Sequence, residues 1–588
     1  MSAGTAEQWP AGSLPDWIEV IEGDAPIVLL APHGGRAGTE AAALTLPRIN
    51  DLHTAEIARD LAARLGASAI INTAMDRNRL DCNRLTQVVA GAPSMLTALA
   101  EKLESCLARH QRAVVLAIHG WNLVEPRVDI GVGLCERDGI LRPVRGAFVS
   151  VSEQFLNGAL ATLAGRLGRA GIAATFGMRY PAGAAQNLVQ ALTGRHRENH
   201  FAILRRLAAL ADNGAIEAAQ LELSMALRIS GSFREAAIQT LVEVLGDQDG
   251  DLARDGRRII QRSAIPRPPA RKAAHDTRNA RLGIEFYDPV RRIGIVASFD
   301  AGYSAGGGRL MILLPSGAIS LYTADGRAGR QNGRIRAGAL IAERIGTALH
   351  LRFRGPALIT PSDVAYTDIE RALARSALEE TAELSLEIKN SAAIDPGSTL
   401  EELGKAAGGF FNSLFGGACG HLSLGRLDYQ LGGVSRIGAA ITAPGPAGLV
   451  ERRMAWACLA PESKLCAVEL EDFLNNRGQQ RTGHLFENNK LAPVSFGFLE
   501  PASLTQKTFG VAIWSSDGRE LRLEGQVDGS ISLMRSLGSS RFHTRLAFAA
   551  FVLDGSAGAG IFETTRRIGS GCALGNISVS GDPPKTAS

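Results

Sequence analysis

The pattern of apolar residues changes near residue 250, and this change constrains the fold more than any other feature of the sequence. Before it, apolar strand-like runs alternate with helix-like segments. After residue 280, short strand-like runs are separated by glycine-rich turns. Because 588 residues are too many for a single core, the two patterns predict separate domains.

Residues 1–250 alternate between the two kinds of segment. The predicted strands span 25–32, 67–75, 112–120 and 218–227, and the predicted helices span 51–66, 94–110, 152–171 and 232–246. Apolar strands that alternate with helices are typical of a mostly parallel sheet covered on both faces. We therefore expect an α/β domain here.

The next thirty residues, 251–280, are basic, contain prolines and lack apolar periodicity, so we expect a linker. Residues 281–420 and 421–580 carry short strand-like runs such as RIGIVASF, ALHLRF and RLAFAAFVL. This pattern predicts an all-β region, either a barrel or a sandwich, that is repeated along the chain. A helix-like insert over 398–420 is expected to interrupt the first half.

Composition excludes several classes of protein. The net charge of +4 gives no reason to expect nucleic acid or an anionic membrane as a partner. No apolar run is long enough for a membrane span. The seven cysteines form no C-x-x-C motif, and the first residues lack the profile of a signal peptide, so we expect a cytoplasmic protein with reduced thiols.

Two histidines and a glutamate lie at or near the ends of predicted strands. His33 follows the strand over 25–32, and His119 ends the strand over 112–120. Glu222 lies in the apolar run 218–227, where a carboxylate is costly to bury unless it is paired or reaches a site. Ligands of open α/β sheets bind beyond the carboxyl ends of the strands. Since two histidines and one carboxylate are the ligands of many catalytic zinc ions, these ends predict a metal site.

The stretch MDRNRLDCNRL, residues 75–85, has two interpretations. It is either a polar loop with local salt bridges or an anion clamp, in which guanidinium groups bind a substrate carboxylate. In the second interpretation, Arg77 also donates hydrogen bonds to a developing oxyanion.

Five segments resemble N-formylglutamate amidohydrolases, in the same order: APHGGR, DLHTAEIARDLAARLGAS, RNRLDCNR, AIHG and AAQLELSMALR. The resemblance covers about residues 25–245. It implies the fold of the carboxypeptidase A-like zinc peptidases. It also implies hydrolysis of the amide bond of an N-acyl amino acid, N-formyl or similar, or of a related amide that bears a carboxylate.

Carried over to this chain, the resemblance implies that Zn2+ is bound by His33, His119 and an acidic residue. Asp51 fits the acidic ligand best because it stands in an Asp-x-His segment. Glu40 is the alternative, since related hydrolases place a glutamate soon after the first histidine. Arg36 occupies the position of the glutamate in the H-x-x-E motif of the peptidases.

The same resemblance assigns roles to the remaining polar residues. Glu222 takes the place of the general base, and Arg77 stabilises the tetrahedral oxyanion. Asn83 and Arg84 bind the carboxylate end of the substrate, and Asp81 orients these side chains.

Residues 281–575 resemble, more loosely, tandem lipocalin-like proteins related to carotenoid hydratases and tocopherol cyclases, in GIEFYDPVRRIGIVASFD and GAGIFETTRRI. This implies two barrel-like halves around an apolar pocket for a hydrophobic ligand. We expect solvated or salt-bridged positions for Glu285, Asp288 and Glu563. The leading function is thus a zinc amidohydrolase fused to a lipocalin-like module. The alternative is a hydrophobic-ligand-binding, isomerase or hydratase protein with a degenerate hydrolase domain.

Overall fold

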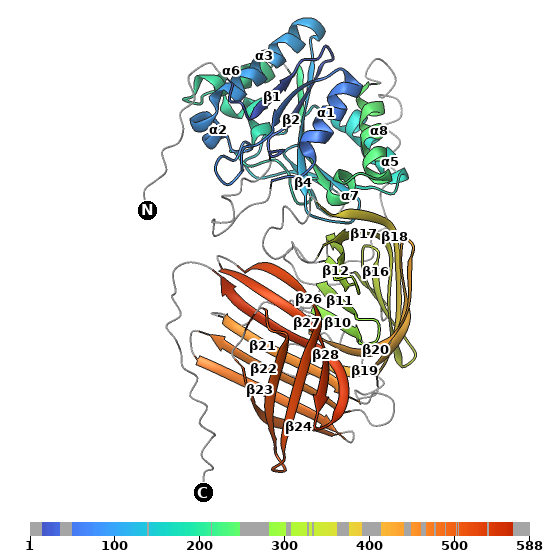
Figure 1. Ribbon diagram of the computed structural model, residues 1–588. Coiled ribbons are helices and arrows are strands. Elements are labelled where there is room, and N and C mark those ends of the chain that lie inside the picture. Colours follow the sequence, from blue (N-terminus) through green and yellow to red (C-terminus); the bar gives the residue numbers. More distant parts are fainter. Residues whose placement is uncertain are drawn as a thin grey trace.

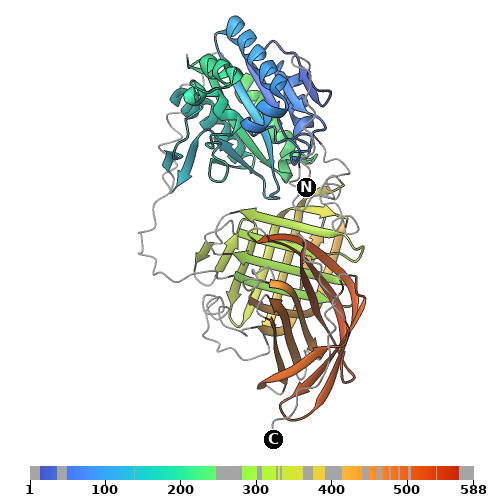
Figure 2. The same ribbon diagram turned by 90° about the vertical axis from the view of Figure 1, so that its left-hand side faces the viewer.

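The computed structural model places an α/β domain, a first β-barrel and a second β-barrel one after another along the molecule (Figures 1 and 2). The residues that the structure describes are 14–35, 50–137, 140–212, 214–246, 281–300, 307–325, 329–331, 334–361, 375–390, 413–439, 449–459, 466–475, 478–487, 490–500, 503, 505–537 and 540–568.

The α/β domain is built on a seven-stranded sheet in the order β1-β3-β2-β4-β9-β5-β8. Its strands are β1 (Ile18–Ile21), β2 (Ile27–Ala31), β3 (Ser68–Asn72), β4 (Ala113–Trp121), β5 (Arg127–Gly131), β8 (Ala173–Phe176) and β9 (Ile216–Ser224). The four central strands β3, β2, β4 and β9 are parallel, whereas β1 pairs antiparallel with β3 and β5 pairs antiparallel with β9. The sheet is therefore mixed, with a parallel centre.

Helices cover both faces of this sheet (Figure 1). They are α1 (Thr54–Leu65), α2 (Leu85–Gly91), α3 (Pro93–His110), α4 (Glu153–Phe155), α5 (Ala161–Arg169), α6 (Ala202–Ala211), α7 (Met225–Arg228) and α8 (Ser232–Gly246). Alternate residues of β2 point to opposite faces. Ile27 and Leu29 pack in the core of α1, α5 and α8, while Val28 and Leu30 pack in the core of α2, α3 and α6.

Short elements complete the domain. A π-helical turn (Leu156–Leu160) joins α4 to α5, two 3-10 turns (Leu188–Leu192 and Gly194–His196) precede α6, and β6 (Leu134–Arg137) pairs with β7 (Ile140–Pro143). The predicted helices and strands of this half are present, with corrections to their bounds. The helix expected over 51–66 begins at Thr54, and the strand expected over 67–75 ends at Asn72. The helix expected over 152–171 is divided into α4, the π-helical turn and α5. The strand expected over 218–227 ends at Ser224, and the next four residues form α7.

The first barrel closes because β13 pairs with both β12 and β17. Its eight antiparallel strands are β10 (Arg281–Asp288), β11 (Ile293–Asp300), β12 (Gly307–Leu313), β13 (Ile319–Asp325), β17 (Ala348–Thr360), β18 (Ala377–Asn390), β19 (Leu414–Leu424) and β20 (Leu427–Ala439). Three further strands extend the same sheet beyond β17: β14 (Gly329–Gln331), β15 (Arg334–Ala337) and β16 (Leu340–Ile345).

The second barrel is a closed antiparallel barrel that runs from β21 to β28. Its strands are β21 (Leu449–Leu459), β22 (Cys466–Asn475), β23 (Gly478–Glu487), β24 (Lys490–Phe498), β25 (Thr508–Ser515), β26 (Glu520–Leu537), β27 (Ser540–Leu553) and β28 (Ser556–Ile568). Its core contains the stacked rings of Phe509 and Phe562, whose centroids are 4.2 Å apart.

Two expectations for the β half are wrong. The boundary expected between residues 420 and 421 falls inside β19, and the first barrel continues to Ala439 because β20 pairs with both β10 and β19. The helical insert expected over 398–420 is a strand from Leu414 onward, and its earlier residues lie outside the described part. The linker expected over 251–280 also lies outside the described residues.

The three bodies are joined by specific contacts. The segment after β4 meets the first barrel where the Val124 amide donates to the Thr323 hydroxyl (3.1 Å) and the Glu125 amide donates to the Thr323 carbonyl (3.1 Å). The two barrels share a buried cluster, in which Glu285 accepts from Trp456 Nε1 (2.6 Å) and from Arg436 Nη1 (3.0 Å). Glu285 is therefore salt-bridged but not solvated.

Asp288 and Glu563 are buried as well. Asp288 Oδ1 accepts from the backbone amides of Val290 (3.0 Å) and Arg291 (2.9 Å), and Glu563 Oε1 accepts from the Thr565 hydroxyl (2.7 Å). Asp288 also pairs with Arg291 (3.3 Å), and Glu563 pairs with Arg452 (3.5 Å). The salt-bridged alternative is therefore confirmed for all three acidic residues, and none of them is solvated.

Six of the seven cysteines lie in the described part of the chain, and all six are free thiols there. None of the helices described in the structure combines the length and the apolar character that crossing a membrane would need.

Candidate metal centre

The loop that carries His33 fits closely against its neighbours because two glycines follow the histidine. A Cβ atom on Gly34 would lie 2.7 Å from the Ala55 Cβ of α1, and one on Gly35 would lie 2.6 Å from the Asn72 side chain at the end of β3. Real Cβ atoms do not approach other atoms so closely. The P-H-G-G sequence therefore brings the backbone beside His33 close to the sheet and to α1.

Three buried side chains meet where β2 and β4 end. His33 follows β2, His119 lies in the parallel neighbour β4, and Asp51 lies three residues before α1. Asp51 Oδ2 is 3.1 Å from His33 Nδ1 and 3.2 Å from His119 Nδ1. One ligand atom from each residue lies within 4.8 Å of the other two. This His–Asp–His group could hold a metal ion.

The chemistry of the donors fits a zinc ion. Two imidazole nitrogens and a carboxylate oxygen are zinc ligands, and such a trio leaves a fourth position open. Among the described residues, the buried His119 Nε2 has no hydrogen-bond partner, and the same ring directs Nδ1 at Asp51. Burial lowers the pKa of His119 to about 4, which keeps its imidazole neutral, as a ligand must be.

The other two members are charged differently. Burial alone would lower the pKa of His33, but the attraction of Asp51 and hydrogen bonds to Asp51 and Asp81 raise it. Burial likewise opposes the charge of Asp51, and the two histidines outweigh it, so that the pKa of Asp51 lies well below its usual value. Asp51 is therefore an ionised carboxylate between two imidazoles.

Asp81 and Arg77 are hydrogen-bonded to members of the His–Asp–His group. His33 Nε2 donates to Asp81 Oδ1 (2.7 Å), and Arg77 Nη1 donates to Asp51 Oδ1 (3.0 Å). Burial would raise the pKa of Asp81, but its hydrogen bond and attraction to His33 lower it to about 2. A carboxylate on the far nitrogen of a histidine fixes the orientation of the ring. Asp81 thus contacts His33 directly, besides accepting from the Asn83 amide (3.1 Å).

Glu222 lies directly opposite His119 in the pairing of β4 with β9. Its Oε1 atom accepts from Gln220 Nε2 (2.7 Å), which lies two residues earlier on the same strand. Burial, together with repulsion from Asp51, raises the pKa of Glu222 well above its usual value. The glutamate is therefore buried beside the His–Asp–His group with one oxygen fixed.

The remaining predicted residues lie around this group. Asn83 Nδ2 is 3.5 Å from Gln220 Oε1, and Asn83 Oδ1 accepts from the Leu188 amide (3.2 Å). The Arg84 side chain is 46% exposed, with Nε 3.8 Å from Asp81 Oδ2. Glu40 and Arg36 lie outside the described residues.

Arg228 is a site-building residue that the sequence did not reveal. Fully buried, it donates to the carbonyl oxygens of Leu52 (2.7 Å), Trp121 (3.2 Å) and Leu223 (3.1 Å). These carbonyls adjoin the three segments that carry Asp51, His119 and Glu222. One guanidinium therefore holds the segments together. Its only sequence signal is an arginine in the otherwise apolar stretch after β9.

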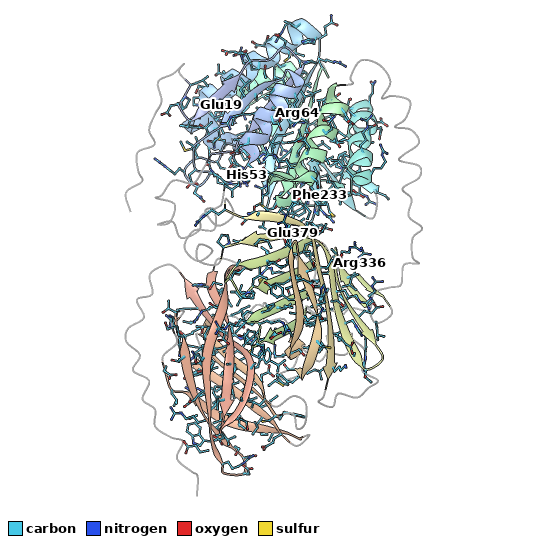
Figure 3. The ribbon with its side chains drawn as sticks, turned by 45° about the vertical axis from the view of Figure 1, so that its right-hand side comes forward. Glu19, His53, Arg64, Phe233, Arg336 and Glu379 are labelled. Carbon is cyan, nitrogen blue, oxygen red and sulfur yellow. The ribbon has the colours of Figure 1, made fainter. Side chains whose placement is uncertain are left out.

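An aromatic cluster forms at the end of β4, the strand that carries His119. Trp121 packs edge-on against Tyr180, and the Arg179 guanidinium lies 5.9 Å from both ring centroids. Asp129 fixes this loop by accepting from the amides of Arg179 (2.9 Å) and Tyr180 (2.8 Å). His53, two residues after Asp51, lies at the edge of the α/β domain that faces the first barrel (Figure 3).

Comparisons with known proteins give only distant structural likenesses. No protein-family model matches the sequence, and no curated protein matches it. Three solved structures are similar to parts of this chain.

The first is an AttH from Nitrosomonas europaea, with 11% identity over 48% of this chain and 91% of that one and a TM-score of 0.28. The second is an N-formylglutamate amidohydrolase from Ralstonia eutropha JMP134, with 12% identity over 42% of this chain and 98% of that one and a TM-score of 0.27. The third is a kievitone hydratase from Nectria haematococca, with 8% identity over 49% of this chain and 88% of that one and a TM-score of 0.25. At these TM-scores, the likenesses carry no argument about this chain.

Proposed function

We propose that the protein is a zinc-dependent amidohydrolase that cleaves the amide bond of an N-acyl amino acid or a related amide bearing a carboxylate. One observation carries the proposal: Asp51 Oδ2 lies 3.1 Å and 3.2 Å from the Nδ1 atoms of His33 and His119 in a buried position. His33, Asp51 and His119 would hold the ion. When bound, zinc supplies a nucleophilic water of lowered pKa and polarises the amide carbonyl.

Glu222 moves the proton in this proposal. Because Gln220 holds Oε1, the other oxygen, Oε2, takes the proton of the attacking water and passes it to the nitrogen of the leaving amine. The pairing of β4 with β9 sets the glutamate beside His119, at the side of the metal ligands.

Arginines give the substrate its orientation. In this proposal Arg77 donates to the oxyanion that forms on the carbonyl oxygen, and its hydrogen bond to Asp51 supports this role. Arg84 is partly exposed beside Asp81 and binds the carboxylate of the substrate, with Asn83 next to it.

The test compares glutamine substitutions of two glutamates on the same strand, β9. Glu222→Gln is expected to lower kcat for N-formyl and N-acetyl amino acids by about 10²–10⁴-fold, the usual contribution of a general base. Glu217→Gln is the matched control, because Glu217 lies on β9 but pairs with Ser152 away from the metal ligands. Equal activity of Glu222→Gln and wild type would contradict the role of Glu222. Absence of hydrolysis by zinc-loaded wild type across these substrates would contradict the proposed reaction.

A hydrophobic ligand for the β half, and with it the hydratase or isomerase alternative, stays a prediction. The core of the second barrel is filled by apolar side chains such as Phe509, Phe551 and Phe562.

A further inference from the structure

A cavity of about 700 Å³ lies at the junction of the α/β domain and the first barrel. The α/β domain contributes Glu125, Pro126 and Phe233, and the barrel contributes strands β15 to β19. None of the described members of the His–Asp–His group lines it. Figure 3 labels Phe233 above this junction and Arg336 on the barrel below it. The volume is in the range of small-molecule sites.

The barrel side of the cavity is one row of residues that are direct neighbours across five strands. Arg336 pairs with Ile341, Ile341 with Arg352, Arg352 with Ser385, and Ser385 with His421. Paired residues project from the same face of a sheet. Since adjacent strands are about 4.8 Å apart, the two arginines stand roughly 10 Å apart along this row.

The row points away from the interior of the barrel and towards the α/β domain. The residues on either side of Arg352, Leu351 and Phe353, are buried in the barrel core, and Arg352 itself is exposed. Because side chains alternate along a strand, the arginine must face outward. Residues of the α/β domain line the cavity opposite this outer surface, so the cavity has walls from both domains.

The charges in the cavity do not cancel. Glu383 pairs with Arg354 (2.9 Å), and Glu125 pairs with Arg127 (3.2 Å), so both lining carboxylates already have an arginine. His421 pairs with Asp428.

Two arginines are left over. Within the described part of the chain, Arg352 has no hydrogen bond or ion pair, and Arg336 donates only its Nε, to the Gly338 carbonyl (2.9 Å). The row therefore offers two guanidinium groups without a carboxylate, beside the apolar side chains of Ile341 and Phe233.

We propose that this cavity binds a small organic carboxylate, with the carboxylate between Arg336 and Arg352 and the apolar body against Ile341 and Phe233. Guanidinium groups bind carboxylates through paired, charge-assisted hydrogen bonds. An apolar body gains further free energy when Ile341 and Phe233 remove it from water. This second site is separate from the metal centre and independent of the proposed hydrolysis.

Calorimetric titration of the full chain with octanoate, octanol and inorganic phosphate tests the proposal. Octanoate is expected to bind at least tenfold more tightly than either octanol or phosphate. Arg336→Gln and Arg352→Gln are each expected to weaken octanoate binding at least fivefold, without changing the hydrolysis of N-acyl amino acids.

Arg344→Gln is the matched control, since Arg344 is on the neighbouring strand β16 and donates its Nε to the Gly346 carbonyl (3.3 Å), as Arg336 does to Gly338. It does not line the cavity, and its octanoate affinity is expected to stay within twofold of wild type. The proposal is overturned by any of three results: no octanoate binding, equal binding of octanol or phosphate, or binding that both cavity variants retain, which would place octanoate elsewhere, including at the metal centre.

Discussion

At the scale of single residues, the candidate metal centre depends on the hydrogen bonds that orient the imidazole ring of His33. Both of its ring nitrogens are engaged, Nδ1 by Asp51 and Nε2 by Asp81. If Nδ1 faces the metal, Asp81 sets the tautomer and the angle of the ring without touching the ion.

Asp81→Asn is therefore expected to raise the dissociation constant for zinc by about 10–100-fold while the fold is kept, because a neutral amide orients the histidine less firmly. Competition with a zinc chelator measures this constant. Asp76→Asn is the control, since Asp76 lies in the same loop and accepts from Asn78 instead of a histidine. Equal zinc affinity of Asp81→Asn and wild type would show that Asp81 does not support the ligand.

Some residues of the candidate site could be predicted from the sequence, and others could not. His33, His119 and Glu222 are visible because each stands at or in an apolar strand, where a polar side chain is conspicuous. Asp51 was predicted as the acidic ligand only from the resemblance to N-formylglutamate amidohydrolases. In the structure its carboxylate lies between the two histidines. Arg228 and Gln220 were missed because their partners are distant in the sequence or lie in the fold's interior.

At the scale of elements, the close approach of β4 to its neighbours positions His119. A Cβ atom on Gly120 would lie 2.6 Å from Arg228 Nη1 and 2.9 Å from the Asp51 Cβ. The strand can carry His119 to the centre only because the next residue has no side chain.

Gly120→Ala is expected to lower the free energy of unfolding by about 1–3 kcal/mol, as overpacking does in well-filled interiors, and to weaken zinc binding with it. Gly168→Ala is the control: a Cβ there meets no atom within 4 Å, and Gly168 lies in α5, so a gain of about 0.5–1 kcal/mol is expected. Denaturant unfolding measures both. An unchanged stability of Gly120→Ala would contradict the packing described here.

The elements themselves were predictable where local pattern decides them. The helix over 94–110 and the strand over 112–120 follow from apolar periodicity and match α3 and β4 within a residue. The assignment of β20 to the first barrel was not predictable, because it depends on pairing with β10, more than a hundred residues earlier. The end of the helix-like insert expected over 398–420 lies in β19, where Gly416 and Gly417 pair with Ser435 and Val434 of β20.

At the scale of the whole molecule, the two barrels are joined through a buried charge cluster. In the described part of the chain, Glu285 and Glu469 share one arginine, Arg436, so two carboxylates have a single guanidinium between them. Burial, only partly offset by Arg436 and Trp456, raises the pKa of Glu285 to about 7.

The folded pKa of Glu285 lies above its usual value of 4.5, so the folded state holds this proton more tightly than the unfolded state. Its contribution to stability is kept below about pH 4.5 and lost as the pH rises through 7, up to about 3 kcal/mol. Glu285→Gln mimics the protonated form. It is expected to match wild type near pH 5 and to be more stable near pH 8.

Unfolding free energies across this pH range measure the difference. Glu524→Gln, at an exposed glutamate of the second barrel, is expected to follow wild type throughout. A difference between Glu285→Gln and wild type that does not grow with pH would contradict the assignment.

We propose that His33, Asp51 and His119 form one zinc site, and the metal content of the purified full-length protein measures whether they do. We predict about one zinc per wild-type chain after zinc loading and dialysis, and loss of this zinc in His33→Ala and His119→Ala. His110→Ala, which alters an exposed histidine bound to the Asp24 carbonyl, is expected to keep it. Wild-type protein that binds no zinc, or equal zinc in all three variants, would contradict the claim.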